Sequence, residues 1–215
     1  MPQPAVVQLA GLRERKKAYT RRLLIDMAVE LCVKQGYENT TIEQIAEAVE
    51  VSPRTFSRYF ASKDAVFIAV IDELSQEITA ELDAQPSGLG PIEALRAAHV
   101  SVLTRVAQRR PVAGLTAERI VLILQVVYSS DALRQAATDY RNPAAMEALA
   151  RHMGVAPDDR RLELAVTLFT TTIVSACQDV AASDPDVELG PDFVLKRMDE
   201  ALGDLVRFAT ELQMP

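Results

Sequence analysis

The residues best suited to chemistry in this sequence lie in one short segment of its first third. Arg54, Ser57 and Arg58 are spaced three and four residues apart, so on a helix they share one face. Each can hydrogen-bond to phosphates or base edges, and arginine is the commonest bidentate partner of guanine in the major groove of DNA. Phe56 and Phe60 are four residues apart and form the opposite, apolar face. The segment therefore predicts a short helix with a packed face and a reading face.

Groups that could catalyse a reaction or bind a metal are not spaced for either task. His99 and His152 have no partner at the spacing of a catalytic pair or a metal site. Cys32 and Cys177 cannot form a disulfide framework and show no zinc spacing. No glycine-rich phosphate loop is present, and with 30 acidic residues any acid–base pair is uninformative. We therefore expect no enzyme activity, no metal and no cofactor, with an all-α enzyme as a remote alternative.

The sequence also predicts a compartment. The basic residues near the N-terminus follow a short apolar stretch, which is the reverse of the order in a secretory signal. No apolar run approaches the roughly 20 residues that a membrane-spanning helix needs. The low cysteine content fits a reducing environment. We expect a cytoplasmic protein without membrane spans.

Helical periodicity and stop signals predict the elements that come before the reading face. Apolar residues recur three and four positions apart over residues 14–35, and Gly36 is suited to end this helix. Thr40, with Glu43 three residues later, predicts a capping box. A second helix should therefore run from this cap to about Val49.

The reading helix has its own start signals. Ser52 supplies an N-cap hydroxyl, and Pro53 follows at the first helical position. This helix should end near Phe60. Two short helices with a tight turn at residues 50–51 have the spacing of a helix-turn-helix, whose second helix enters the major groove of DNA.

Breaker residues divide the rest of the chain into further helices. Ser62 predicts the start of a linking helix over residues 63–84, and the Pro- and Gly-rich residues 85–91 predict a domain boundary. Further helices are expected over 91–108, 112–129, 131–152, 158–182 and 191–212, with Pro143 kinking or splitting the one that contains it. The class is all-α with about nine helices: a helix-turn-helix domain over residues 1–63, the linking helix, and a larger helical domain over residues 85–215.

The charge of the chain is unevenly distributed. The total is −7, from 23 basic and 30 acidic residues, which by itself argues against a nucleic-acid partner. Residues 1–63, however, hold ten basic and seven acidic residues, a net +3, whereas residues 64–215 hold 13 and 23, a net −10. This asymmetry favours a nucleic-acid-binding N-terminal part, residues 1–63, joined to an acidic remainder of the chain. We expect this acidic remainder to weaken non-specific DNA binding.

Residues 13–67, about a quarter of the chain, resemble the DNA-binding domain of TetR-family transcriptional regulators. The resemblance lies in the basic segment and in short matches at Gly36-Tyr37, Thr40-Thr41-Ile42, Ile45-Ala46, Val51-Ser52, Thr55-Phe56, Tyr59-Phe60 and Ser62-Lys63-Asp64. It implies a DNA-binding regulator, by family default a repressor. The chain departs from the family at Glu50 and Arg54, where Gly is frequent, and at Ser57, where Tyr is frequent. The operator sequence therefore does not carry over, and Glu50 would cost about 1 kcal/mol in a left-handed turn.

The resemblance implies roles for individual residues of this domain. It implies that Thr41, Ser52, Tyr59 and Lys63 anchor phosphates, and that Arg54, Thr55, Ser57 and Arg58 face the groove. A basic arm of Arg13, Arg15, Lys16 and Lys17 would reach the neighbouring backbone or minor groove and could lack order without DNA. Each residue also has an ordinary structural explanation: the hydroxyls can be helix caps, the tyrosine can be packed, and the lysine can be solvated.

One reading helix covers only a few base pairs, so a helix-turn-helix protein generally binds a palindromic operator as a dimer. The last two long helices carry broad apolar stripes, and the resemblance implies that they pair with their copies in a four-helix bundle. The residues expected at this interface are Phe169, Ile173, Ala176, Met198, Leu202 and Leu205. The alternative is that both stripes face the protein's own core.

The resemblance also implies that the larger domain binds a small-molecule effector, which releases the protein from DNA. Candidate pocket residues are the polar side chains within otherwise apolar helices: His99, Gln125, Tyr128, Tyr140, Thr171 and Cys177. With few buried charges expected, the effector would be small and apolar. Ordinary core roles explain each residue equally well. A second alternative is a regulator without an effector, whose body serves dimerisation or protein partners.

Overall fold

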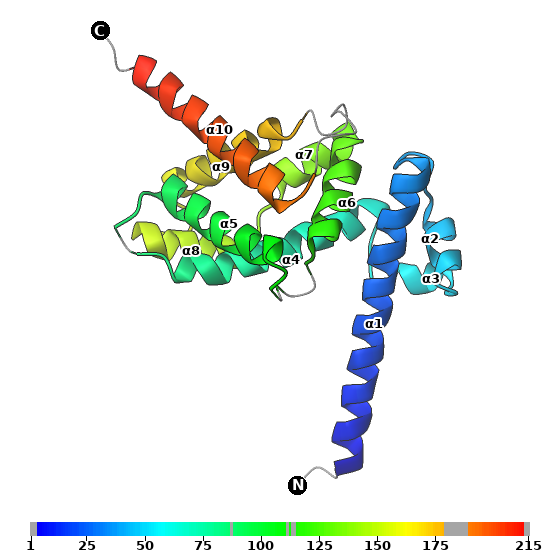
Figure 1. Ribbon diagram of the computed structural model, residues 1–215. Helices are drawn as coiled ribbons and strands as arrows, with labels where there is room; N and C mark the ends of the chain where they lie inside the picture. Colours follow the sequence, from blue (N-terminus) through cyan, green and yellow to red (C-terminus); the bar gives the residue numbers. More distant parts are fainter. Residues whose placement is uncertain (1–3, 87, 111, 113–114, 179–188, 213–215) are drawn as a thin grey trace. The chain divides into compact units, whose positions relative to one another are not determined.

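The computed structural model (Figure 1) describes residues 4–86, 88–110, 112, 115–178 and 189–212. Over these residues the regular elements are helices, with one isolated bridge between Val112 and Leu115. The helices are α1 (Pro4–Gln35), α2 (Ile42–Ala48), α3 (Pro53–Phe56), α4 (Lys63–Asp83), α5 (Pro91–Ala107), α6 (Ala117–Tyr128), α7 (Asp131–Asp139), α8 (Pro143–Met153), α9 (Arg160–Ala176) and α10 (Pro191–Glu211). The all-α prediction is confirmed, with ten helices in the described residues where about nine were expected.

The chain forms two compact units, Met1–Phe67 and Ile68–Pro215. The first unit holds α1, α2, α3 and the start of α4, and the second holds the remaining helices. The breaker residues 85–91 therefore lie inside the second unit, as the connection between α4 and α5. The physical reason is that Ile78 and Leu82 of α4 belong to the same apolar core cluster as the buried face of α5.

Helix ends in the first unit follow local rules, with one correction to the sequence analysis. Gly36 ends α1 with a φ of 87°, a conformation that costs glycine little. The capping box lies one residue later than expected: Thr41 is the N-cap, and Gln44 is its partner. Thr40 is buried instead, and its hydroxyl donates to the carbonyl of Gly36 at 2.9 Å.

The turn between α2 and α3 is held by backbone bonds and by one left-handed residue. The amide of Val51 donates to the carbonyl of Ala46 at 2.9 Å, which folds the chain back after α2. Glu50 has a φ of 57°, a left-handed backbone conformation that glycine adopts with less strain than a residue with a side chain. The helix α2 contacts both α1 and α3. Their shared core contains Leu24, Ile25, Ala28, Ile45, Ala46, Phe56, Phe60, Val66 and Phe67.

The second unit is a helical bundle around one large apolar cluster. The helix α10 packs on α5 and α9, and α8 packs on the same two helices. Pro143 divides the helix expected over residues 131–152 into α7 and α8, as predicted. Asn142 caps α8 by accepting from the amide of Ala145 at 2.9 Å, and its amide donates to Asp72 of α4 at 2.7 Å.

Two helix boundaries differ from the prediction in this unit. The helix expected from residue 112 begins at Ala117, because Thr116 caps it by accepting from the amide of Arg119. The helix expected to reach residue 182 ends at Ala176; residues 179–182 lie outside the described part of the chain. Across the residues that the structure describes, no helix is both long and apolar enough to cross a membrane.

Candidate nucleic-acid interface

The reading helix α3 starts at the cap and the proline that the sequence predicted. The side chain of Ser52 accepts from the amide of Thr55 at 3.1 Å, and Pro53 stands at the first helical position. The regular helix has only four residues, but the amides of Ser57 to Phe60 still donate to carbonyls three or four residues earlier. The helical spacing of side chains therefore continues through the turn that follows α3.

The apolar face of this segment is packed as predicted. Phe56 and Phe60 are both buried, with ring centroids 5.7 Å apart. The guanidinium of Arg21, on α1, lies 5.4 Å from the ring centroid of Phe60. The contact between the two phenylalanine rings and the cation–π contact of Arg21 with Phe60 hold the orientation of α3 within the first unit.

The opposite face of the segment is open to solvent. Arg54, Ser57 and Arg58 are exposed, and Thr55 and Tyr59 are partly buried. Among the described residues, neither Arg54 nor Arg58 has an ion pair or a side-chain hydrogen bond. Two guanidinium groups are therefore available on one face, each with five donors in a planar fork.

The hydroxyl groups around α3 are partly used by the fold. The hydroxyl of Ser57 donates to the carbonyl of Pro53 at 3.1 Å, and the hydroxyls of Ser52 and Thr55 share one bond of 2.9 Å. A hydroxyl has a single proton, so Ser57 can accept but not donate, and one free proton is left between Ser52 and Thr55. Thr41 uses only its oxygen for capping, so its proton is free for a phosphate.

Lys63 makes internal contacts that the sequence analysis did not anticipate. Its ammonium group donates to the carbonyls of Tyr37 and Thr40, the latter at 2.7 Å, and lies 3.9 Å from the ring centroid of Tyr37. The hydroxyl of Tyr37 in turn donates to Asp64. Of the three donors of the ammonium group, one remains for a phosphate. Lys63 thus ties the start of α4 to the corner between α1 and α2.

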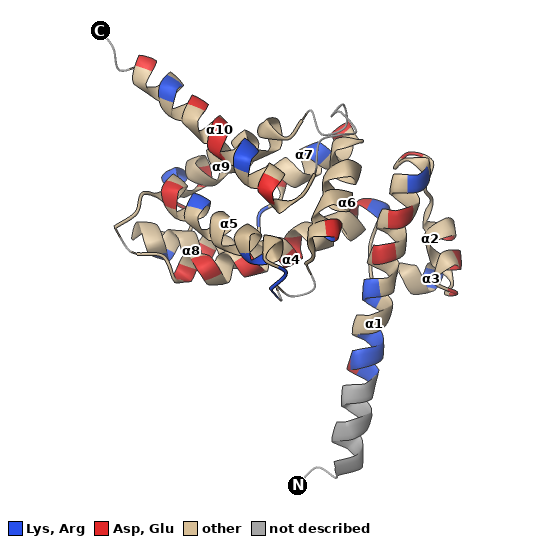
Figure 2. Ribbon diagram, in the orientation of Figure 1, with Lys and Arg blue, Asp and Glu red and all other residues tan. Residues whose placement is uncertain are grey.

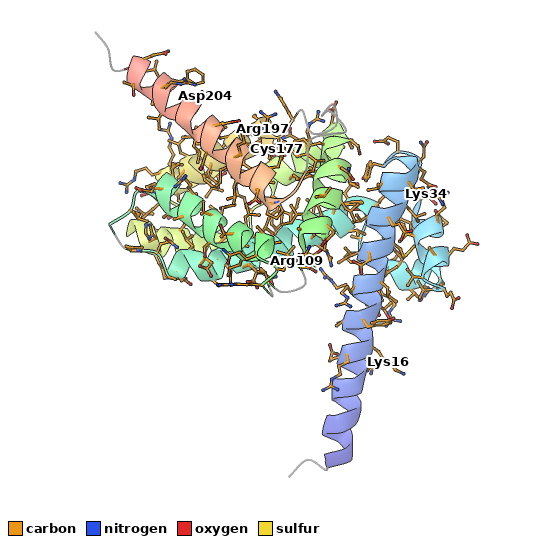
Figure 3. The ribbon with its side chains drawn as sticks, in the orientation of Figure 1. Lys16, Lys34, Arg109, Cys177, Arg197 and Asp204 are labelled. Carbon is orange, nitrogen blue, oxygen red and sulfur yellow. The ribbon has the colours of Figure 1, made fainter. Side chains whose placement is uncertain are left out.

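The basic arm lies within α1 rather than in an irregular segment. Arg13, Arg15, Lys16 and Lys17 are all in the helix and exposed. Figure 2 shows basic residues gathered along this part of α1, and Figure 3 labels Lys16 there. Their exposure leaves all four charges free to attract a polyanion.

The residues expected at a dimer interface fall into two groups. Phe169, Met198 and Leu202 are buried in the protein's own core cluster. The other three, Ile173, Ala176 and Leu205, are partly buried. Exposed apolar residues on the same helices are instead Leu164 and Leu168 of α9 and Val206 and Phe208 of α10, with Leu212 just beyond it. Hydrophobic periodicity identified the apolar faces of these two helices but could not tell the buried from the exposed edge of a broad stripe.

The candidate effector residues are spread over the second unit. The imidazole of His99 packs at 4.8 Å on Phe169 and shares a 2.7 Å hydrogen bond with the carbonyl of Leu95. Burial lowers the pKa of His99 to about 4, so the ring is neutral at neutral pH. Burial and a hydrogen bond to Asp72 raise the pKa of Tyr140 to about 12.

The remaining four candidates divide between core and surface. Tyr128 and Cys177 belong to one small buried cluster, and the hydroxyl of Tyr128 donates to the carbonyl of Val174 at 2.9 Å. Gln125 and Thr171 are exposed. The structure therefore brings together two of the six candidates, and His99, Tyr128 and Tyr140 each have a hydrogen-bond partner within the protein.

A pocket of about 840 Å³ lies elsewhere in the second unit. It is formed by the end of α5, the start of α6 and the start of α10, and none of the six candidates lines it. Val106, Leu115 and Phe193 contribute apolar surface, and Arg109 stands at its edge with a φ of 54°. No spacing in the sequence indicates this pocket, because its lining residues come from separate segments that only the fold brings together.

The fold and the exposed face of α3 define the class of protein as a helix-turn-helix protein. Residues 24–70 match the model of the bacterial regulatory proteins of the tetR family. The similarity to this family lies in the helix-turn-helix domain that these residues form. The relatives that it matches are transcriptional regulators.

Two curated relatives and one solved structure show how far the similarity extends. The chain is 51% identical over 96 residues to the HTH-type transcriptional regulator TcmR of Streptomyces glaucescens, covering 45% of this chain and 42% of that protein. It is 30% identical over 90 residues to the HTH-type transcriptional regulator RutR of Escherichia coli K12, covering 42% of each. The matches therefore span less than half the length of these relatives. The structure of FadR from Thermus thermophilus with lauroyl-CoA has a TM-score of 0.46 and 22% identity, covering 85% of this chain and 93% of that one.

Proposed function

We propose that this chain is a transcriptional repressor of the cytoplasm that binds a palindromic operator in double-stranded DNA as a homodimer. The observation that carries the proposal is the two-sided segment at α3. Phe56 and Phe60 are buried on one side, and Arg54 and Arg58 are exposed and unpaired on the other. Only a polyanionic, hydrogen-bonding partner such as DNA uses such a face fully.

The phosphate contacts follow from the protons that the fold leaves free. Thr41 and Ser52 stand at helix starts, are exposed, and serve there as caps through their oxygen atoms. Tyr59 and the third donor of Lys63 complete the set of phosphate donors in this unit. The charges of Arg13, Arg15, Lys16 and Lys17 extend the contact along the DNA backbone.

The proposed homodimer is supported by the apolar surface left on α9 and α10. Leu164 and Leu168 are one helical turn apart on α9, and both are exposed. Residues 206–212 of the last helical segment are exposed at every position, and the end of α10 extends beyond its neighbours in the second unit (Figure 1). Val206 and Phe208 lie there with 65% and 60% of their surface exposed, and a second copy of the chain would cover them.

We further propose that a small, largely apolar effector binds the second unit and releases the DNA. The pocket between α5, α6 and α10 is large enough for such a molecule. Release requires that the effector bind the DNA-incompetent state more tightly than the competent one. The alternative is a regulator without an effector, whose second unit serves only dimerisation or protein partners.

Mobility shifts on the DNA around the protein's own gene test the DNA-binding proposal. The wild-type chain should shift a palindromic fragment at physiological salt. Arg54→Ala should weaken this binding by about 1–3 kcal/mol and relax specificity at one base pair. Arg160→Ala is the matched control, because Arg160 is exposed in the second unit and should not affect binding. A uniform loss of affinity over all base-pair variants would contradict base reading by Arg54.

The effector proposal is tested by filling the pocket. Val121→Trp places a large side chain into the lining of the pocket while leaving the first unit unchanged. We expect the variant to shift operator DNA like the wild type and to lose release by a compound that releases the wild type. A panel of small apolar compounds that never releases the wild-type protein would favour the regulator without an effector.

A further inference from the structure

We infer that the exposed side of residues 54–58, in α3 and the turn after it, donates to bases through two arginines alone, so that each operator half-site carries a guanine for Arg54 and a guanine for Arg58. The inference rests on the proposed DNA-binding function and specifies the bases that it selects. It concerns the four side chains expected to face the groove: Arg54, Thr55, Ser57 and Arg58. Their hydrogen-bond partners within the protein decide which of them can read a base.

The proton of Ser57 is not available to a base. Its hydroxyl donates to the carbonyl of Pro53 at 3.1 Å, inside the same helical segment. Its oxygen could still accept from an amino group, but it cannot donate to the acceptors of guanine. Ser57 therefore adds no donor for a base beside the two arginines.

Thr55 is also poorly placed to donate to a base. Its hydroxyl lies 2.9 Å from the hydroxyl of Ser52, and one proton is used in that bond. Ser52 is exposed and stands at the start of α3, whereas Thr55 is partly buried. The remaining proton of the two hydroxyls is therefore expected on Ser52, from which it can donate to a phosphate.

The two arginines, by contrast, keep all their donors. Both are exposed, and neither has an ion pair or side-chain hydrogen bond among the described residues. An arginine fork matches the two acceptors that guanine presents in the major groove, O6 and N7. Adenine offers only one acceptor beside a donor, so an unpaired guanidinium prefers guanine.

The spacing of the arginines limits the spacing of the guanines. Arg54 and Arg58 are four residues apart, and a helical turn rises by about 5.4 Å. Successive bases of one strand are about 3.4 Å apart along the DNA axis. Two guanidinium groups one turn apart therefore reach guanines that are adjacent or separated by one base pair.

Selection from a random duplex library with the full chain tests the inference. The wild type should enrich sites with two guanines at this spacing in each half-site. Replacing either guanine by 7-deazaguanine removes the N7 acceptor and should weaken binding roughly tenfold to a hundredfold. Arg54→Ala and Arg58→Ala should each lose the preference at one guanine, because alanine leaves no donor for the O6 and N7 acceptors.

Arg160→Ala is the matched control, because it removes an exposed arginine from the second unit and leaves residues 54–58 unchanged. We expect this variant to select the same bases with the same affinity as the wild type. Enriched sites without the two guanines, or an unchanged base preference after removal of either arginine, would overturn the inference while leaving DNA binding intact. If no duplex is enriched at all, the proposed function fails, and the inference fails with it.

Discussion

At the scale of single residues, Glu50 is a strained position in the first unit. Its φ of 57° places a side chain in the left-handed region, at the turn that joins α2 to α3. A non-glycine residue there costs about 1 kcal/mol or more. The strain lies beside the reading helix, so the turn is held by the packing around it and not by its own preference.

Glu50→Gly should raise the free energy of unfolding of the first unit by about 0.5–1 kcal/mol, because the relief of strain exceeds the added chain entropy of glycine. Hydrogen exchange of the buried amides in α2 and α3 measures the change. Glu47→Gly is the matched control of opposite sign, since Glu47 is exposed inside α2, where glycine destabilises a helix. A loss of stability in Glu50→Gly would show that the turn is not strained.

His99 makes the stability of the second unit depend on pH. Burial lowers its pKa in the folded state from the ordinary 6.5 to about 4. Above pH 6.5 the ring is neutral whether the chain is folded or not. Between pH 6.5 and pH 4 the unfolded chain takes up a proton that the folded chain does not, so stability falls as the pH falls, by about 3 kcal/mol in all.

The variant His99→Leu removes this titration and keeps an apolar side chain against Phe169. Denaturant unfolding between pH 7 and pH 4 should show a shallower loss of stability in the variant than in the wild type. Equal slopes in the two proteins would mean that His99 is not kept neutral by burial.

At the scale of elements, Lys63 connects three parts of the first unit. Its ammonium group bonds to carbonyls on the corner between α1 and α2 and belongs to the first turn of α4. Hydrogen bonds from a charged donor are stronger than neutral ones, at about 1.5–3 kcal/mol each. The residue therefore positions α2 in addition to its proposed phosphate contact.

Lys63→Met keeps the length of the side chain and removes the charge and the donors. We expect the first unit to lose about 1–3 kcal/mol of stability, because two carbonyls lose their partner, and DNA affinity to fall alike for all sequences. Thermal unfolding and exchange of the amides at residues 37–41 measure the first effect. Lys34→Met, at an exposed site in the last turn of α1 (Figure 3), should change neither. Unchanged exchange in Lys63→Met would refute the positioning role.

At the scale of the whole molecule, the proposed dimer would decide whether two helix-turn-helix domains bind one operator together. The net +3 of residues 1–63 is too small to hold DNA tightly against a body of −10. Two helix-turn-helix domains on one palindrome double the base contacts and the phosphate contacts. Specific binding should therefore depend on the apolar surfaces of α9 and α10.

Leu168→Glu should shift the chain toward monomer in equilibrium sedimentation at micromolar concentration, because it places a charge within the proposed apolar interface. DNA affinity should fall with the loss of the dimer. Val33→Glu is the control, since Val33 is exposed on α1 and should leave the assembly unchanged. A wild-type chain that is monomeric at this concentration would rule out the proposed dimer.

The sequence by itself determined the helical class and the two-sided segment at α3. Both depend on local rules: Ser52 and Pro53 start the helix, and the spacing of Phe56 and Phe60 assigns its buried face. Pro143 divides a helix for an equally local reason, which is that proline has no amide proton and clashes with the preceding turn. Contacts between neighbours in sequence are set by residue type and spacing, so they could be predicted.

Only the tertiary structure decided how distant residues meet. Lys63 bonds to Tyr37 and Thr40, which are 26 and 23 positions away in the chain, and no pattern of spacing announces such a contact. Phe169 and Ile173 are one helical turn apart on the same stripe, yet Phe169 is buried and Ile173 is only partly buried. The reason is that periodicity gives the direction of a side chain on its own helix, whereas burial depends on which other helices cover that direction.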